Sequence, residues 1–468
     1  MALRLYNTYS REVEDFTPLD AAGREVRLYT CGPTVYSFAH IGNFRAYIFE
    51  DLLQRHLEAR GYRVRRVMNL TDVDDKTIRG CREKGVPLAE FTAPFKKAFF
   101  VDLGVLRITP AESYPEATAD QYIQRMVEMI RVLVERNYAY QAEDKSVYYR
   151  INQFPKYGCL AHLDLEQMRP SGRVSSDEYE KESVGDFALW KAWDEADGDV
   201  GWESPWGRGR PGWHIECSAM AGALLGDELD IHCGGEDNIF PHHEAEIAQT
   251  EAVTGKKFVR YWMHCKHLMV DGQKMSKSLG NFYTLRDVVA KGYTGREVRY
   301  SLLRVNYGLP LNFTFEGMAG ARESLHRIDE WVARLTAHAG SAAAEPHPLA
   351  EDHGFEDALD QDLNISGALG HLFEIVRETN RAMDQESVTS GQARSLLDWW
   401  TRINRTLALE PDADANTVPP QVQSLADERA AARSNKNWKR SDELRDAVAA
   451  KGWTIKDTKD GQKLTRIP

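Results

Sequence analysis

Two cysteines, a histidine and a glutamate in this sequence could together hold a metal ion. His242 and Glu246 are four residues apart in a helical pattern whose first turn suits Pro241, so they share one face of that helix. With Cys31 and Cys217 they make a set of two sulfurs, one imidazole and one carboxylate, which is typical of tetrahedral zinc. A histidine and a glutamate at this spacing also occur on solvated helices, and the spacing alone leaves that interpretation open.

The stretch over residues 28–46 could bind phosphate. A short apolar strand over residues 26–29 runs through a Gly-Pro break into a helix that we expect to begin near Gly42. Such a turn places backbone N–H groups and the positive end of a helix dipole where a phosphate could sit. His40 and Asn43 stand at the helix entrance, where capping or packing is the alternative role.

A second candidate for phosphate binding is the loop over residues 274–278, Lys-Met-Ser-Lys-Ser, which we call the lysine loop. Lys274 and Lys277 lie beside a Gly-Asn turn and precede a helical pattern over residues 285–307. A flexible cationic loop suits polyanionic phosphates. An ordinary exposed loop is the alternative.

The segment over residues 62–78 alternates into a second strand and then becomes acidic. It carries Thr71 and the aspartates Asp72, Asp74 and Asp75. A strand, a helix and a second strand predict a right-handed parallel crossover, and in such sheets ligands gather beyond the carboxyl ends of the strands. The acidic cluster is equally typical of a helix cap.

Composition limits the class of protein. A chain of 468 residues with 42% hydrophobic and 28% charged residues is typical of a globular protein with about two to four domains. No stretch approaches the roughly 18 apolar residues of a membrane span, and the start lacks a leader pattern, so we expect a cytoplasmic protein without membrane contact. Six scattered cysteines do not form a disulfide framework.

Charge is distributed unevenly along the chain. A net charge of −12 argues against indiscriminate nucleic-acid binding. Residues 427–468, however, carry 11 Lys and Arg against 7 Asp and Glu. This tail could follow a phosphate backbone, or it could simply be a solvated surface.

These patterns predict an α/β fold, with a Rossmann-type parallel-sheet domain, an inserted domain, a helical bundle and a small C-terminal module. Linkers are expected over residues 338–348 and 409–422. The expected domains are the two halves of the parallel-sheet domain, 1–113 and 201–265, the insertion, 114–200, the lysine-loop region, 266–319, the bundle, 320–409, and the module, 425–468.

Several segments together resemble a known family. CGPTVYSFAHIGN, GWHIECSAM, FPHHEAEIAQ and KMSKS, in this order and separation, resemble the class I aminoacyl-tRNA synthetases and, within them, the cysteinyl-tRNA synthetases. The likeness continues through DFALWKAW, SPWGRGRPGW, VRYSLLRVNYGLPLNF and ARSNKNWKRSDELRD, so it covers nearly the whole chain. Residues 40–43 would be the first family signature and residues 274–278 the second.

The resemblance implies a cysteine–tRNA ligase. Such an enzyme activates L-cysteine with ATP and transfers it to tRNA(Cys), and ATP brings Mg²⁺. Catalysis would be positioning and electrostatic stabilisation of charge on the phosphates. The implied catalytic residues are His40, Asn43, Lys274 and Lys277. The implied ATP site adds Gly42 and Asp237 to His40, Asn43 and Lys277.

The resemblance also implies one zinc ion per subunit, held by Cys31, Cys217, His242 and Glu246. Zinc prefers a soft thiolate to a hydroxyl, so it would separate cysteine from serine. Four protein ligands normally mark a closed structural site, and the shell would have to expand or Glu246 to loosen for substrate. Thr71 and Trp213 match residues that line the cysteine pocket.

In the tail, Trp438 and Asp442 match residues that the family uses on the tRNA anticodon, where an aromatic ring stacks on a base. By analogy the protein would be a monomer.

The sequence departs from the family pattern at three places. Cys233 stands where a glycine is common. The ESVG segment over residues 182–185 replaces a basic-proline pair, and NYGLPLNF lacks a basic residue that is common after its tyrosine. The last two put the expected tRNA contacts in doubt.

Two rival functions stay open. A ligase that joins cysteine to an aminosugar in mycothiol synthesis resembles the same catalytic half and zinc site, but such relatives generally stop before an anticodon module. A non-catalytic, zinc-containing tRNA-binding scaffold is the other rival. Intact His40, Lys277 and metal ligands argue against a scaffold.

Overall fold

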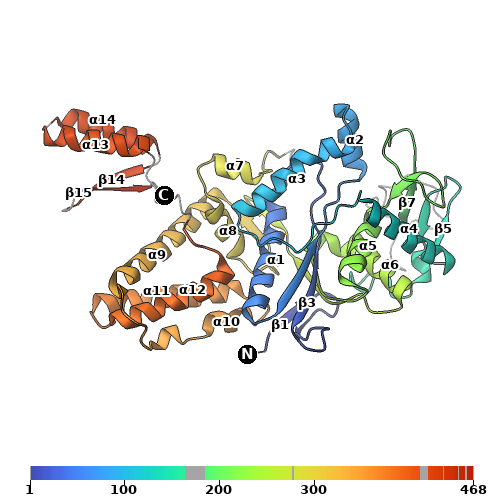
Figure 1. Ribbon diagram of the computed structural model, residues 1–468, viewed down its shortest axis with the longest axis horizontal. Coiled ribbons are helices and arrows are strands. Elements are labelled where there is room, and N and C mark those ends of the chain that lie inside the picture. Colours follow the sequence, from blue (N-terminus) through green and yellow to red (C-terminus); the bar gives the residue numbers. More distant parts are fainter. Residues whose placement is uncertain are drawn as a thin grey trace.

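The fold is that of a computed structural model (Figure 1). It describes residues 2–163, 185–276, 279–411, 420–435, 437–451, 453–458 and 461–466. Lys277 and most of the ESVG segment lie outside the described residues. No helix in these ranges combines the length and the apolar character that crossing a membrane requires.

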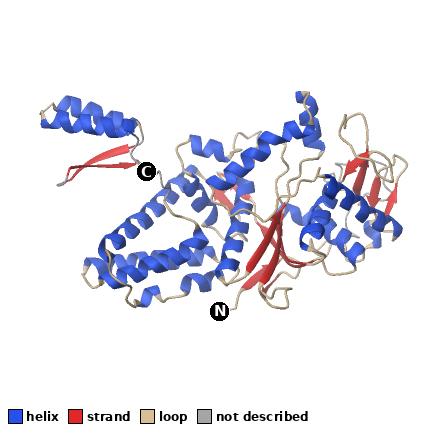
Figure 2. Ribbon diagram, viewed as in Figure 1, coloured by secondary structure: helices blue, strands red, loops and turns tan. Residues whose placement is uncertain are grey.

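A four-stranded parallel sheet stands at the centre of the chain (Figure 2). Its order is β10-β9-β3-β4, and its strands are β3 (Glu25–Thr30), β4 (Arg63–Met68), β9 (Leu229–Gly235) and β10 (Val259–Cys265). Helix α1 (Ile41–Ala59) connects β3 to β4, as the predicted crossover requires. Val26, Leu28 and Tyr29 of β3 are all buried, because both faces of the sheet are covered. The carboxyl ends of β3, β4 and β9 therefore meet at one edge.

A second sheet forms the insertion between β4 and β9, on the right in Figure 1. It is antiparallel, with the order β5-β6-β7-β8, and packs beside α4 (Asp120–Glu135). Its strands are β5 (Ala139–Gln141), β6 (Val147–Tyr149), β7 (Phe187–Ala192) and β8 (Gly209–Pro211). Helices α5 (Trp213–Leu225) and α6 (Glu244–Thr254) flank β9 in the sequence and complete the parallel-sheet domain.

Several elements went unpredicted. They are β1 (Arg4–Asn7), β2 (Glu12–Asp15), α2 (Asp75–Lys84) and α3 (Leu88–Val105). The helical pattern over residues 285–307 is two helices, α7 (Leu285–Ala290) and α8 (Gly295–Leu303). Gly292, with a φ of 88°, and Thr294, which caps α8, separate them.

Lys274, the first residue of the lysine loop, ends a strand of a small sheet made of β11 (Leu268–Val270), β12 (Gln273–Lys274) and β13 (Leu311–Phe313). A helical bundle follows, on the left in Figure 1. It comprises α9 (Phe315–Ala339), α10 (Gly354–Leu359), α11 (Ile365–Asp384) and α12 (Ser390–Leu407). Trp331 of α9 packs edge-on against Trp399 of α12 in its core.

The C-terminal module has a small core of its own around Val422, Val448 and Trp453. Its elements are α13 (Pro420–Ser434), α14 (Trp438–Ala450), β14 (Trp453–Thr458) and β15 (Gly461–Arg466). Helix α13 was not predicted, and the linker expected over residues 409–422 is wrong at its end. Pro420 is the first residue of α13, a position where the missing N–H costs nothing.

Candidate active site and metal centre

His40 and Asn43 cap the start of α1 reciprocally. The backbone N–H of Asn43 donates to His40 Nδ1 at 3.2 Å, and the backbone N–H of His40 donates to Asn43 Oδ1 at 3.1 Å. The capping alternative for His40 is therefore correct. Because Nδ1 accepts, the proton of the neutral imidazole is assigned to Nε2. A Cβ at Gly42 would lie 2.9 Å from His40 Nδ1, so a larger residue at this position would clash with the imidazole ring.

The segment after the lysine loop lies against this helix start. The N–H of Ile41 donates to the carbonyl of Tyr283 at 3.0 Å, and the rings of His40 and Phe282 meet edge to face at 5.1 Å. A Cβ at Gly42 would also lie 3.3 Å from Met275 Cε. The loop and the entrance of α1 thus form one surface.

Asn281 closes the lysine loop. Its Oδ1 accepts from the N–H of Ser276 at 2.8 Å, and its Nδ2 donates to the carbonyl of Lys274 at 3.3 Å. Lys274 ends the exposed strand β12, and Asn281 thereby ties the two ends of the loop together.

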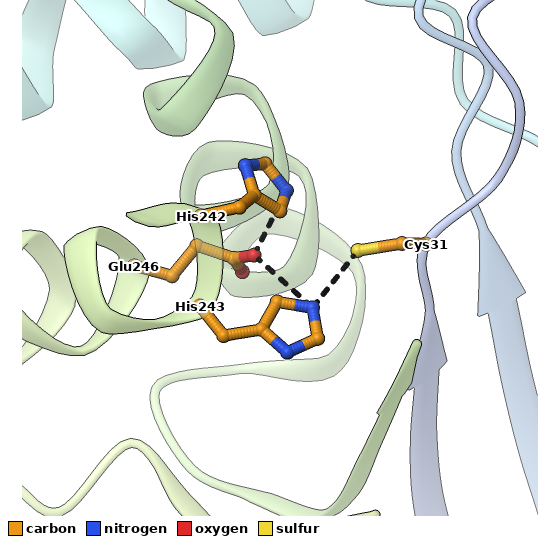
Figure 3. A group of neighbouring side chains, drawn as sticks. All are labelled: Cys31, His242, His243 and Glu246. Atoms are coloured by element: carbon orange, nitrogen blue, oxygen red, sulfur yellow. Dashed lines mark hydrogen bonds and ion pairs between the residues drawn. The ribbon is translucent and has the colours of Figure 1, made fainter. Parts of the chain in front are cut away.

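Four side chains converge at the carboxyl edge of the central sheet (Figure 3). Cys31, His242, His243 and Glu246 each offer a ligand atom, and these atoms all lie within 4.8 Å of one another. Cys31 directly follows β3, and the other three come from the turn Ile239–His243 and from α6. His243 Nε2 lies 3.2 Å from Cys31 Sγ, and His242 Nε2 lies 3.1 Å from Glu246 Oε1.

Cys217 joins this group through Cys31. It is buried on α5, and its thiol is a hydrogen-bond partner of the Cys31 sulfur. The group whose ligand atoms all lie within 4.8 Å of one another thus contains three of the four predicted ligands, Cys31, His242 and Glu246. It includes His243, which was not predicted, and Cys217 adjoins it at Cys31. The signal that could have revealed His243 is its i, i+3 spacing to Glu246, which puts both on one side of the helix.

Burial sets the protonation of the cluster. Desolvation raises the pKa of Cys31, and that of Cys217 well above its ordinary value. It lowers the pKa of His242 and His243 well below the ordinary imidazole value, and it raises the pKa of Glu246. A bound cation would favour the thiolates and leave the imidazoles neutral, as ligands must be.

The carboxyl group of Glu246 supports metal binding. Its Oε2 lies 3.0 Å from His232 Nε2, but its buried Oε1 has no hydrogen bond of suitable geometry among the described residues. This oxygen faces His242 Nε2 at 3.1 Å without hydrogen-bond geometry, and a buried carboxylate oxygen in that position is costly unless something else binds it. Sulfur, imidazole and carboxylate donors in this arrangement fit a zinc ion.

Other side chains fix the two histidine rings. His242 Nδ1 lies 3.0 Å from His214 Nδ1, and His243 Nδ1 lies 2.8 Å from His264 Nε2. His264 in turn contacts Thr8 Oγ1 through Nδ1 at 2.8 Å. Such second partners orient ligating imidazoles.

Trp213 and Thr71 flank this centre. Trp213 begins α5, is 43% exposed, and stacks on His242 with ring centroids 4.2 Å apart. Thr71 is buried beyond the end of β4, and its hydroxyl donates to Glu216 Oε2 at 2.9 Å. Glu216 was not singled out from the sequence.

The aspartates near Thr71 have structural partners. Asp74 caps α2 by accepting from the N–H groups of Lys76 and Thr77, so the helix-cap alternative is correct for this residue. Asp72 pairs with Lys96 at 2.7 Å.

Asp237, predicted for the ATP site, is exposed in the short turn that follows β9. It lies at the same edge of the sheet as the cluster.

Trp438 and Asp442 lie one turn apart on α14. Trp438 is 56% exposed, with the Arg433 guanidinium 5.5 Å from its ring centre. Asp442 is exposed and pairs with Arg445 at 3.4 Å. Both side chains are therefore available on the surface of the small module.

Comparisons with known proteins agree with this arrangement. The family described as tRNA synthetases class I (C) catalytic domain matches residues 17–323. A methionyl-tRNA synthetase from Mycobacterium tuberculosis, solved in complex with methionyl-adenylate, shares the fold with a TM-score of 0.61 at 16% identity, covering 82% of this chain and 89% of that one. The fold and the site define a class I aminoacyl-tRNA synthetase.

The remaining matches specify the family. A DALR domain matches residues 354–407, and a cysteinyl-tRNA ligase anticodon binding domain matches residues 415–464. A cysteine–tRNA ligase from Protochlamydia amoebophila is 51% identical, covering 99% of this chain and 98% of the relative. Another from Chlamydia muridarum is 49% identical, with full coverage of both chains. The chain belongs to the cysteinyl-tRNA synthetase family.

Proposed function

We propose that this enzyme is a cysteine–tRNA ligase. It activates L-cysteine with ATP to cysteinyl-adenylate and then transfers the cysteinyl group to tRNA(Cys), releasing AMP and pyrophosphate. The observation that carries the proposal is the sulfur, imidazole and carboxylate cluster at the same sheet edge as a histidine-capped helix and its lysine loop. ATP use implies Mg²⁺ with the nucleotide.

His40 and the entrance of α1 serve the activation step. The cysteine carboxylate attacks the α-phosphorus of ATP, and negative charge grows on the phosphate oxygens. The Nε2–H of His40, held by Asn43, and the first N–H groups of α1 would donate to these oxygens. Gly42 leaves room for the nucleotide, and Asp237 would approach the ribose.

Lys274 and Lys277 would stabilise the leaving pyrophosphate. Lysine side chains beside a polyanionic phosphate neutralise the negative charge that develops on the leaving group. The ties from Asn281 hold Lys274 at one end of this loop, opposite the start of α1.

Cys31, Cys217, His242 and Glu246 would hold the zinc ion that selects the substrate. Zinc supplies a preference for thiolate over hydroxyl and favours loss of the thiol proton. Trp213 would cover the bound amino acid from its place above His242, and Thr71 would contact it. His243 lies close enough to act as a further ligand or to orient Cys31.

The C-terminal module supports tRNA as the acceptor. Trp438 would stack on an anticodon base, and Asp442 would accept from a base edge. The match over residues 415–464 favours tRNA over the aminosugar acceptor of the rival ligase.

Cysteine-dependent ATP–pyrophosphate exchange tests the proposal, with serine as the matched substrate and bound zinc quantified. We expect exchange with cysteine only, and its loss together with the metal in Cys217→Ser. Charging of tRNA(Cys) then separates a synthetase from an aminosugar ligase. Zinc-loaded, folded protein without cysteine-dependent exchange would overturn the proposal.

A further inference from the structure

The C-terminal end of α12 is held by arginines from other parts of the chain. The last carbonyl groups of a helix have no partner within it, and cations favour that end of the helix dipole. Here four carbonyls at the end of α12 each accept from an arginine side chain. The donors are Arg55 to Arg405 at 2.9 Å, Arg299 to Leu407 at 2.7 Å, Arg107 to Ala408 at 3.2 Å and Arg296 to Leu409 at 2.8 Å.

The backbone at this point is fixed in a strained form. Ala408 has a φ of 54° and a ψ of 51°, in the left-handed region that residues other than glycine rarely adopt. Leu409 is completely buried, and its N–H donates to the side chain of Asn404 at 2.9 Å. A strained backbone persists only where its surroundings determine it. The four arginines and these contacts therefore make the end of α12 a fixed point, which we call the arginine anchor.

The arginine anchor joins α12 to the helix that carries His40. Asp51 of α1 is completely buried, and its Oδ2 accepts from Arg55 at 2.8 Å and from Arg299 at 2.6 Å. Arg55 belongs to α1, Arg299 belongs to α8, and Arg107 follows α3. Three segments that precede the bundle in the chain therefore converge on its last turn.

The chain leads from the arginine anchor to the C-terminal module. The first helix of the module, α13, begins at Pro420, and Arg107 also donates to the carbonyl of Glu410. Within the described residues, the elements of the module pack closely only on one another, and Figure 1 shows them apart from the bundle. The position of the module consequently depends on where α12 ends.

We propose that Arg55, Arg107 and Arg299 are positioning residues for the charging of tRNA. They fix the end of α12 against α1, and they thereby hold the anticodon-binding module in a defined relation to the site of activation. One tRNA then contacts both sites without first having to order this connection, which makes binding at two linked sites tighter. The inference rests on the proposed function, because it takes tRNA(Cys) as the acceptor and the module as its anticodon site.

Arg107→Ala tests the inference in the full-length, zinc-loaded protein. The variant loses the donor to the carbonyls of Ala408 and Glu410. We expect the KM for tRNA(Cys) in charging to rise about tenfold, the size of one lost hydrogen bond to a charged donor. Pyrophosphate exchange without tRNA should change by less than about twofold, because the site of activation is untouched.

A double-mutant cycle with Trp438→Ala separates positioning from mere stability. Trp438 is the proposed anticodon contact, so its loss should matter less once the module is no longer held in place. We expect the effect of Trp438→Ala on kcat/KM for charging to be at least about threefold smaller in Arg107→Ala than in the wild type. A purely structural role of Arg107 would lower exchange and charging together and leave the two substitutions independent.

Arg136→Ala is the matched control. Arg136 also donates to carbonyls near the end of a helix, those of Ala252 and Val253 in α6, at 2.8 Å and 3.0 Å, but α6 does not lead to the module. This variant should leave the KM for tRNA and the effect of Trp438→Ala unchanged. If Arg107→Ala does not fold, Arg55→Lys takes its place, since lysine keeps the charge beside Asp51 but lacks the guanidinium fork.

The outcomes distinguish this inference from the proposed function. A wild type that does not charge tRNA(Cys) would show that the proposed function itself is wrong. If the wild type charges tRNA(Cys), an unchanged KM for tRNA in the anchor variant, equal losses of exchange and charging, or independent effects of the two substitutions would each overturn the inference.

Discussion

The imidazole of His40 and the amide of Asn43 each bond to the other's backbone N–H at the start of α1. This reciprocal cap gives His40 two roles that can be separated. Its Nδ1 stabilises the helix, and its Nε2 is the nitrogen proposed to act on ATP.

His40→Asn should separate these roles. Asparagine is a good N-cap, so the variant should keep its thermal stability, but its amide does not reach as far as Nε2. We expect pyrophosphate exchange to fall about a hundredfold or more, the usual cost of one lost donor to developing charge. His40→Ala should lose similar activity and also about 1 kcal/mol of stability. Equal activity of His40→Asn and the wild type would contradict the proposed role of Nε2.

Asn281→Ala should loosen the lysine loop. The variant loses both the acceptor for Ser276 and the donor to Lys274, while the buried core is untouched. We expect the rate of pyrophosphate exchange to fall about tenfold, because the lysines must be positioned before they can act. Asn281→Asp keeps the acceptor and should retain more activity. The rates at saturating ATP and cysteine provide the measurement, and a rise in the cysteine KM alone would argue against loop positioning.

The candidate site could be predicted from residue types, but its supporting contacts could not. Metal-binding residue types in segments that resemble a known family are enough to single out Cys31, Cys217 and His242. Glu216 has the same type and spacing as any acidic residue early in a helix, and only the meeting of α5 with the end of β4 brings it to Thr71. Contacts between distant elements leave no local pattern.

Cys217→Ser and His243→Gln should differ in zinc affinity. If Cys217 is a ligand, its loss removes one of two adjacent sulfurs, and zinc affinity should fall by more than about a hundredfold. His243→Gln should cost about ten- to a hundredfold if the imidazole only orients Cys31. Competition with a chromophoric chelator measures both constants. The reverse order would make His243 the ligand in place of Cys217.

The fold was predictable where a periodic pattern dominates. The short apolar strand at β3, the helix after it and the alternating second strand predict the parallel crossover, and the structure confirms it. Helix α3 was missed because Pro94 lies inside it, and α13 because a Pro-Pro pair resembles a linker. In both helices proline lies in the early turns. Proline is usually a sign that no helix is present, but at such positions its missing N–H costs little and tertiary packing can still form the helix.

Trp438→Ala should affect tRNA and not activation. An exposed ring that stacks on a base contributes about 1–3 kcal/mol, so kcat/KM for charging should fall about tenfold to a hundredfold. Pyrophosphate exchange without tRNA should be unchanged. Trp453→Ala is the contrasting variant, because Trp453 is buried in the core of the module and its loss should unfold that module. Unchanged charging by folded Trp438→Ala would argue against an anticodon contact.

Glu50 should make the stability of the protein depend on pH. It is completely buried in α1, and burial raises its pKa from 4.5 to about 8, against the attraction of the Arg66 guanidinium. Between these values the folded state holds a proton that the unfolded state has released. The contribution of Glu50 to the free energy of unfolding is therefore fully present below about pH 4.5, decreases as pH rises, and levels off above about pH 8.

Glu50→Gln removes this titration and keeps the shape of the side chain. Relative to the wild type, the variant should gain about 3–5 kcal/mol of stability as the pH rises from about 4.5 to about 8. Urea denaturation of both proteins at matched zinc, followed by tryptophan fluorescence at several pH values, gives this difference. Histidines and thiols also titrate in this range, but they are common to both proteins and cancel. A difference that stays constant with pH would show that Glu50 is ionised in the folded protein, with Arg66 compensating its charge.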